Sequence, residues 1–303
     1  MPDLLVVGDA NPDLVLRGGD VVPAFGQREQ LVDHADLTLG GSGAIMACGA
    51  ARLGLEVAIC ARVGDDELGR CTREALREAG VDDAHVHAAA DEATGISVGL
   101  VRDGDRAVLT ATGALATLDP DSVTDELLAS ARHVHVASPF LQPRLADGLG
   151  RLVERAHAGG ATVSIDTGWD PAERWELPAQ ALSGADVLLP NAEEAIRLAA
   201  GADARSAARA LAAAGPVVAL KLGAEGAAAY AGDDSAEVAP PAVEAVDATG
   251  AGDSFDAGFL AAWLEGEPLG AALALGVACG ALSTRAAGGT AAQPTLAEAR
   301  ALT

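Results

Sequence analysis

Positive charge is scarce in this 303-residue sequence, in which 20 lysine and arginine residues stand against 44 aspartate and glutamate residues, for a net charge of −24. Nucleic acids and anionic membranes are normally bound by clusters of lysine and arginine. We therefore expect neither of them as a partner. A triphosphate would have to be held by backbone N–H groups and metal ions against this charge, so a nucleotide site should be rich in glycine.

Cysteine and long apolar runs are also scarce. The four cysteines are widely spaced and form no C-x-x-C pair, which argues against a zinc framework or a disulfide scaffold and favours buried thiols in a reducing compartment. No apolar run reaches the roughly 18–20 residues that a membrane-spanning helix needs. The N-terminus lacks the basic region and cleavage site of a signal peptide, and we expect a cytoplasmic protein.

Short apolar runs alternate with stretches of helical period that are rich in alanine, leucine and arginine. This alternation predicts an α/β fold with a mainly parallel central sheet flanked by helices. The predicted strands are 4–7, 57–60, 134–137, 162–165, 187–189 and 217–220, and the predicted helices are 44–53, 68–79, 145–158, 192–199 and 204–214. The alanine- and glycine-rich segment from Ser254 to Thr284 predicts two closely packed helices.

Two segments break the alternation. Residues 94–112 predict a β-hairpin around Asp103-Gly104, a dipeptide that suits a tight turn. Residues 14–39 lack a helical period and could pair with this hairpin in a small β-sheet, a lid over one end of the main sheet. Because no linker or repeat divides the chain, we expect a single domain over residues 1–303. The exposed lid sheet could also pair with a second copy, which would give a homodimer.

The most informative segment is Asp247–Phe255, with the sequence DATGAGDSF, which leads into the last helical region. The small residues Gly250, Ala251 and Gly252 let the backbone approach a ligand, and the free N–H groups at a helix start attract negative charge. They predict an anion hole. Asp253 in the first helical turn would reach the same anion and could take a proton from an attacking hydroxyl. A helix-start charge beside an ordinary turn is the structural alternative.

Two common nucleotide-binding motifs do not fit. A dinucleotide fingerprint needs a small residue where Phe255 stands, and a Walker A loop needs a lysine after its last glycine. Lys221 is the only lysine of the chain and follows Leu220 instead. It ends a predicted strand, where α/β proteins bind ligands, and an ammonium binds phosphate as a point charge. A lysine at the sheet edge without a ligand is the alternative.

Taken in order, these motifs resemble the ribokinase/PfkB family of carbohydrate kinases along nearly the whole chain. The DATGAGDSF segment is similar to the family's C-terminal signature. This resemblance implies that Asp253 is the catalytic base and that the amides of Gly250–Gly252 form the anion hole. Residues 40–44 resemble the N-terminal glycine-pair signature, which implies substrate contacts from Gly40, Gly41 and Ser42.

The resemblance also implies ATP and Mg²⁺ as cofactors. Asn191-Ala192-Glu193-Glu194 is similar to the N-x-x-E element that organises Mg²⁺ and phosphate through water, so Asn191 and Glu194 are candidates. Lys221, Gly223 and Gly226 fall where family members contact the nucleotide, as does Gly252. Many members bind a monovalent cation such as K⁺, for which Asp247 and carbonyl groups around residues 286–289 are candidates.

The substrate side matches the family less completely. Asn11 and Asp13 follow the first strand, where ribokinase-like members hold substrate hydroxyls, and an Asx turn around Pro12 is the alternative. Ile45 stands where the glycine-pair signature normally carries asparagine, which leaves the sugar undefined. Asp166 is a secondary candidate, because the residues after it depart from the family's usual pattern.

These residues predict an ATP-dependent phosphotransferase that acts on a hydroxyl of a sugar or sugar-like small molecule. A nucleoside kinase of the same fold is an alternative, with Phe25 and Phe140 as candidates for a base pocket. A catalytically silent sugar-binding protein is a third possibility. His133 and His135 share one face of a strand, but no ligand lies at metal-binding spacing beside them, which favours core or surface histidines.

Overall fold

The central feature of the fold is a large sheet, seen in a computed structural model that describes residues 2–102 and 105–303. Over these residues the sheet has nine strands in the order β13-β12-β11-β10-β9-β8-β1-β4-β5, of which only β12 and β13 run antiparallel to their neighbours. The strands are β1 (Leu4–Val7), β4 (Val57–Gly64), β5 (Asp82–Ala89), β8 (His133–Ala137), β9 (Thr162–Asp166), β10 (Val187–Leu188), β11 (Val217–Lys221), β12 (Ala227–Ala231) and β13 (Asp234–Val238).

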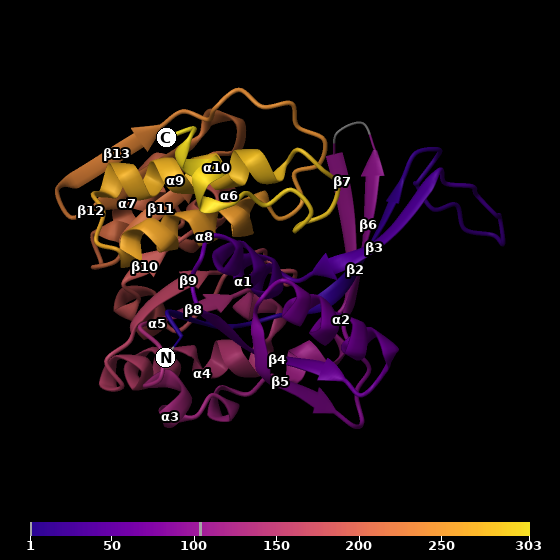
Figure 1. Cartoon of the computed structure of the whole chain (residues 1–303), viewed down its shortest axis with the longest axis horizontal. Coiled ribbons are helices and arrows are strands. Elements are labelled where there is room, and N and C mark those ends of the chain that lie inside the picture. The colour runs from indigo at the N-terminus through magenta and orange to yellow at the C-terminus, as the bar shows by residue number, and fades with distance from the viewer. Residues whose placement is uncertain (1, 103–104) are drawn as a thin grey trace.

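Helices cover both faces of this sheet (Figure 1). One face packs against α1 (Ser42–Arg52), α2 (Glu67–Glu78), α8 (Ala251–Leu264), α9 (Leu269–Ser283) and α10 (Leu296–Arg300). The other packs against α3 (Asp125–Leu128), α4 (Pro143–Ala158), α5 (Ala179–Gly184), α6 (Ala192–Leu198) and α7 (Ala204–Ala212). Along β1, Leu4 and Val6 enter the first core while Leu5 and Val7 enter the second. Because both faces are buried, the strand is apolar throughout.

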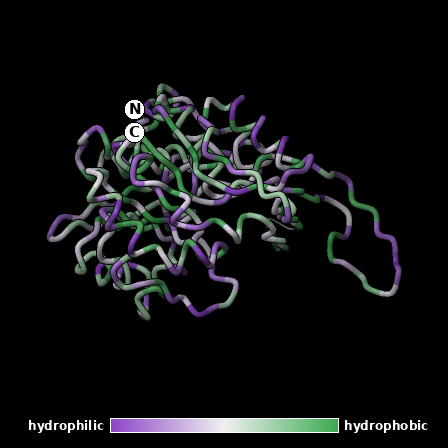
Figure 2. The backbone as a smooth tube through the Cα atoms, turned by 90° about the horizontal axis from the view of Figure 1, so that it is seen from below, coloured by the Kyte–Doolittle hydropathy of each residue, from purple (hydrophilic) through white to green (hydrophobic). Residues whose placement is uncertain are grey.

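A second, smaller sheet projects from one end of the body in the strand order β3-β2-β6-β7 (Figure 1). Its strands are β2 (Asn11–Arg17), β3 (His34–Gly40), β6 (Ile96–Arg102) and β7 (Asp105–Ala111). We call it the lid sheet. The segments predicted to form a lid, 14–39 and 94–112, supply these strands, and the predicted Asp103-Gly104 turn lies outside the described residues. The connection between β2 and β3 extends away from the body (Figure 2).

Most of the predicted elements are present with small shifts at their ends. The helices predicted between 254 and 284 are α8 and α9. Gly258 lets them pack closely, because a Cβ at this position would lie 2.7 Å from the Sγ of Cys279. The sequence analysis missed β5 and the β12–β13 hairpin. The reason is local composition, because β12 reads AAAYA and alanine has little preference for strands.

The cysteines and the apolar helices answer two expectations from composition. Cys48, Cys60 and Cys279 are buried free thiols, as predicted, whereas Cys71 is exposed on α2, where the prediction of burial was wrong. Within the described ranges, none of the helices combines the length and the apolar character that a membrane span requires.

Candidate active site

The predicted site residues converge at the carboxyl ends of the parallel strands, beneath the lid sheet. Strand β9 ends at Asp166 and β11 at Lys221, while Asp9 follows β1 and Asn191 follows β10. Carboxyl ends of neighbouring parallel strands meet at one edge, where α/β proteins bind ligands. There they border a cavity of ≈ 460 Å³, which we call the polar cavity. Its lining includes the predicted residues Asn11, Asp13, Gly41, Ser42, Asn191, Glu194, Lys221, Gly223, Gly250, Gly252 and Asp253.

The predicted anion hole is the start of helix α8. Gly250 precedes the helix with a φ of 70°, and a Cβ at this position would lie 2.8 Å from both the Cα of Gly289 and the Cγ2 of Ile45. Glycine is therefore required here for both backbone conformation and space. The first N–H groups of α8 have no partner within the helix. That of Ala251 donates to the carbonyl of Ala248 at 3.2 Å, while Gly250 and Gly252 border the polar cavity.

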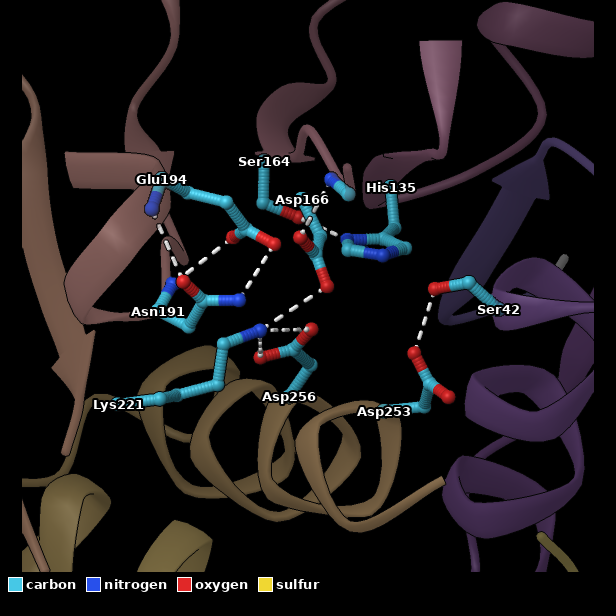
Figure 3. A network of polar contacts seen from close by, with 10 residues as sticks. Ser42, His135, Ser164, Asp166, Asn191, Glu194, Lys221, Asp253 and Asp256 are labelled. Carbon is cyan, nitrogen blue, oxygen red and sulfur yellow. Dashed lines mark hydrogen bonds and ion pairs between the residues drawn. The ribbon is translucent and has the colours of Figure 1, made fainter. Parts of the chain in front are cut away.

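Asp253 lies in the first turn of α8 and faces the polar cavity (Figure 3). The hydroxyl of Ser42 donates a hydrogen bond of 2.5 Å to its Oδ1. Burial and the nearby carboxylate of Asp166 raise the pKa of Asp253 to about 7, against the hydrogen bond from Ser42 and the charge of Lys221, which lower it. A carboxylate with this pKa is suited to accept a proton near neutral pH.

The largely buried side chain of Lys221 forms an ion triad beside this helix start (Figure 3). Its ammonium donates to Asp166 at 2.9 Å and to both carboxylate oxygens of Asp256 at 3.1 Å. A Cβ on Gly252 would lie 3.6 Å from this ammonium, so the positive charge borders the predicted anion hole. The sequence analysis did not predict these two carboxylate partners.

Asp256 escaped the sequence analysis, although it lies one turn after Asp253 on the same helix face. Burial raises its pKa well above the ordinary value. Burial also acts to raise the pKa of Asp166, but the charge of Lys221 outweighs it and the net shift is downward. Burial would lower the pKa of Lys221, and the surrounding carboxylates reverse this effect. The triad therefore sets one ammonium against two buried carboxyl groups whose pKa values are shifted in opposite directions.

Asn191 and Glu194 form a capping box at the start of α6. The Oδ1 of Asn191 accepts from the backbone N–H of Glu194 at 2.9 Å, and the carboxylate of Glu194 accepts from the backbone N–H of Asn191 at 2.8 Å. Both side chains border the polar cavity. Burial and the charge of Asp166 raise the pKa of Glu194 to about 7. The N-x-x-E spacing thus has a structural reason, because capping requires it.

Asn11 and Asp13 project into the polar cavity from the beginning of β2, so the Asx-turn alternative is wrong. The Nδ2 of Asn11 donates to Asp13 at 3.1 Å. Burial and the charge of Asp9 raise the pKa of Asp13 to about 6. Gly40 does not line the cavity, and a Cβ there would lie 2.0 Å from the Cγ of Asp13. Its role is to leave room for Asp13.

Asp9 is a further residue that the sequence analysis did not single out. It is buried, and its carboxylate accepts from the backbone N–H groups of Ser42 at 3.1 Å and Gly43 at 2.9 Å, which fixes the start of α1. The capping pattern could not be recognised from sequence, because the acceptor is 33 residues away from Ser42.

Asp247 precedes the predicted anion hole in the chain and does not line the polar cavity. Its carboxylate accepts hydrogen bonds from the backbone N–H groups of Thr249 and Gly288, each at 2.9 Å, and from the hydroxyl of Thr249 at 2.7 Å. Partial burial acts to raise its pKa, but these hydrogen bonds outweigh it and keep the pKa below the ordinary value. The carboxylate ties the loop before α8 to the segment around Gly288.

The two histidines of β8 belong to the core, as the sequence analysis favoured. Both are fully buried, and the Oγ of Ser164 lies 2.7 Å from the Nε2 of His133 and 2.8 Å from the Nδ1 of His135. Burial lowers the pKa of His133 to about 3 and that of His135 to about 4, so both are neutral. Neither belongs to a group of potential metal ligands found among the described residues.

A second cavity of ≈ 600 Å³ adjoins the first, and we call it the apolar cavity. Phe255, Val243 and Val277 contribute to its walls, as do the predicted nucleotide residues Gly223 and Gly226. It shares Lys221, Gly223, Ala248 and Gly252 with the polar cavity. The start of α8 thus lies between a cavity lined by carboxylates and one lined by apolar side chains, an arrangement that can bring two different molecules together at this helix start.

A family model described as "pfkB family carbohydrate kinase" matches residues 1–296. The chain belongs to this family. Among its relatives, the ATP-dependent ribose-1-phosphate kinase of Halopiger xanaduensis is 33% identical over 290 residues, which cover 93% of this chain and 92% of the relative. The ribokinase of Haemophilus influenzae is 29% identical over 308 residues, which cover 97% and 96%. The structure of Arabidopsis thaliana ribokinase complexed with ribose and ATP has a TM-score of 0.85, with 26% identity and coverage of 99% and 98%.

Membership of the family confirms the predicted ribokinase-like fold and the prediction of a carbohydrate kinase. In this carbohydrate kinase Ile45, which stands in place of the usual asparagine, is buried and borders the polar cavity beside Gly250. It gives that part of the wall an apolar surface. The aromatic candidates for a base pocket do not line this cavity over the described residues, since Phe25 is 96% exposed and Phe140 packs against Trp175.

Proposed function

We propose that the protein transfers the γ-phosphoryl group of ATP to a hydroxyl of a sugar or sugar-like molecule, with Asp253 as the catalytic base. One observation carries this proposal. Asp253 faces the polar cavity at the helix start that separates it from the apolar cavity, and its pKa is raised to about 7. A hydroxyl in the polar cavity would thus meet a proton acceptor and an anion-binding helix start at the same point.

The apolar cavity is the proposed site of the adenosine part of ATP. Its apolar walls suit a nucleobase, and the shared residues Lys221, Gly223 and Gly252 would lie along the phosphates. The amides of Gly250, Ala251 and Gly252 would stabilise the charge that develops during transfer, which suits a chain with few cations.

Mg²⁺ is the proposed metal cofactor, bound through water by Asn191 and Glu194. The oxygen atoms of these side chains belong to the ligand class that Mg²⁺ prefers, and both side chains border the polar cavity. When bound, Mg²⁺ would offset the phosphate charges. Titrating the nucleotide-loaded protein with Mg²⁺ tests this assignment, because the metal affinity of Glu194→Gln should fall while that of Glu193→Gln, on the exposed side of α6, should not.

Asn11 and Asp13 are proposed to bind hydroxyl groups of the substrate, and Gly41 and Ser42 to approach it from the start of α1. The carboxylate of Asp13 accepts hydrogen bonds and the amide of Asn11 can donate, which suits a polyol. The apolar wall at Ile45 supports a substrate with no hydroxyl at that side. A sugar remains favoured over a nucleoside, because the proposed aromatic base pocket does not border the polar cavity.

The test of the catalytic assignment is Asp253→Asn, assayed by coupled ADP release with a panel of sugars, sugar phosphates and nucleosides. Loss of the base should lower kcat by about 10²–10⁴-fold while ATP still binds, as calorimetry would measure. Ser42→Ala is the matched variant, because it removes the hydrogen bond to Asp253 and keeps the carboxylate. Turnover of Asp253→Asn within tenfold of the wild type would refute the assignment, and no turnover of any acceptor by the wild type would refute the kinase activity.

We further propose a single domain over residues 1–303, a K⁺ site at Asp247 and a homodimer through the lid sheet. The last rests on exposed apolar side chains on its strands, Leu37 on β3 and Val108 and Leu109 on β7. If Leu109→Asp and the wild type sedimented as the same species, this would argue against such a dimer.

The K⁺ site at Asp247 has its own test. Equal activity in K⁺ and in choline buffers would argue against it. Four free thiols fit a cytoplasmic location.

A further inference from the structure

An arginine of the lid sheet contacts the loop before the predicted anion hole. Arg106 lies on β7, and its Nη1 donates a hydrogen bond of 2.7 Å to the Oγ1 of Thr249. Thr249 immediately precedes Gly250, the residue from which α8 starts. Both partners border the polar cavity, and Thr249 is buried. The contact joins residues 143 positions apart in the sequence.

The hydroxyl of Thr249 both donates and accepts a hydrogen bond. It gives its single proton to the carboxylate of Asp247 at 2.7 Å, so the Arg106 guanidinium meets a lone pair whose direction is already fixed. Asp247 in turn accepts from the backbone N–H of Gly288. Arg106, Thr249, Asp247 and Gly288 therefore form one continuous chain of hydrogen bonds from the lid sheet to the loops around the anion hole.

The lid sheet approaches the same loops at a second point. A Cβ on Gly288 would lie 3.2 Å from the Cγ2 of Thr38 on β3. The lid also supplies a part of the polar cavity, because Asp13, Ser97 and Thr110 line it from β2, β6 and β7. A molecule bound in that cavity would contact the lid sheet and the helix start together.

We propose that Arg106 is a positioning residue that couples closure of the lid sheet over the acceptor to alignment of the anion hole through Thr249. The inference rests on the proposed function for its catalytic consequence. The amides of the anion hole stabilise charge only when they are held in a fixed direction, and a loop tied to the lid is held when the lid is closed. With the lid open, the helix start loses this tie, so phosphoryl transfer to water is disfavoured.

The variants Arg106→Gln, Thr249→Val and the double variant test this coupling. Valine has nearly the shape of threonine but neither donates nor accepts, and Thr249→Ser retains the hydroxyl. Arg17→Gln is the matched control, because Arg17 also lies in the lid sheet but pairs with Asp36 within it. In the kinase assay each single variant should lower kcat by about tenfold with the KM for ATP within about twofold, and Thr249→Ser should restore it.

The double variant should be no slower than the slower single variant, because both changes remove the same hydrogen bond. The fraction of ADP released without phosphorylation of the acceptor should rise in both single variants and not in Arg17→Gln. The proposal would be overturned if the loss of kcat in the double variant equalled the product of the two single losses. It would also be overturned if the fraction of ADP released without phosphorylation of the acceptor did not change.

Hydrogen–deuterium exchange of the ligand-free protein gives a readout that needs no activity. Arg106→Gln and Thr249→Val should both speed exchange of the amides from 249 to 253, while Arg17→Gln should not. Unchanged exchange overturns the coupling whether or not the enzyme turns over. Faster exchange in a protein that phosphorylates no acceptor would leave the positioning role intact and refute the proposed function instead.

Discussion

Replacing Lys221 with methionine tests whether the charge of its ammonium contributes to the free energy of unfolding. Methionine keeps most of the length and volume of lysine but removes the ammonium. The side chains that it leaves behind are nearly inaccessible to water, with exposed fractions of 7% for Asp166 and 1% for Asp256. Removing one partner of a buried ion pair costs about 3–5 kcal/mol, because the remaining charge is neither solvated nor paired.

Asp166 should account for most of this cost. Its pKa is below the ordinary value chiefly because the charge of Lys221 outweighs the effect of burial, whereas burial raises the pKa of Asp256 well above the ordinary value. Lys221→Met should therefore lower the free energy of unfolding by about 3–5 kcal/mol, and Lys221→Met with Asp166→Asn should recover a large part of it. The control is Arg197→Met, which breaks an exposed pair with Glu193 and should cost less than about 1 kcal/mol.

The loss in the free energy of unfolding of Lys221→Met relative to the wild type should also depend on pH. Without the ammonium, burial raises the folded-state pKa of Asp166 above its unfolded value, so the folded variant binds more protons than the unfolded chain between these two values. Its stability then falls as pH rises through that window, whereas in the wild type the lowered pKa of Asp166 makes the carboxylate stabilising above its unfolded pKa. The deficit relative to the wild type should be larger at pH 8 than at pH 5.

Urea unfolding at both pH values measures this, with the midpoint compared at equal m. A deficit below about 1 kcal/mol, or one that is the same at pH 5 and pH 8, would refute the reasoning from burial and charge. A double variant no more stable than Lys221→Met would show that Asp166 is not the unpaired group.

Two further predictions concern catalysis. kcat/KM should rise with pH and level off above about 7, because the pKa of Asp253 is raised to about 7 and only its carboxylate accepts a proton; a pH profile flat from 5 to 8 would contradict this. Gly40→Ala should raise the KM for the acceptor by at least about tenfold and leave that for ATP unchanged, since the new Cβ would fall 2.0 Å from the Cγ of Asp13. An unchanged acceptor KM would show that Asp13 can move without loss.

Local patterns predicted the fold and much of the candidate site. Apolar runs with both faces buried indicated the parallel strands, and the helical period indicated the helices that cover them. The strand-end positions of Asp166 and Lys221 followed from the same pattern, because the carboxyl ends of parallel strands meet at one edge. The glycines at 250 and 252 and Asp253 were recognisable as candidates because small residues beside a charged one at a helix start are typical of anion-binding sites.

By itself, then, the sequence determined the architecture, the family and the edge of the sheet at which the polar residues gather. Only the tertiary structure decided what each polar group meets. Lys221 acquires its partners from β9 and α8, Arg106 on the lid sheet donates to Thr249, and Gly40 leaves room for Asp13 on a neighbouring strand. The physical reason is the sequence separation over which each effect acts. Strand and helix periods act over a few residues, whereas these hydrogen bonds and contacts join segments that only the packing of distant elements brings together.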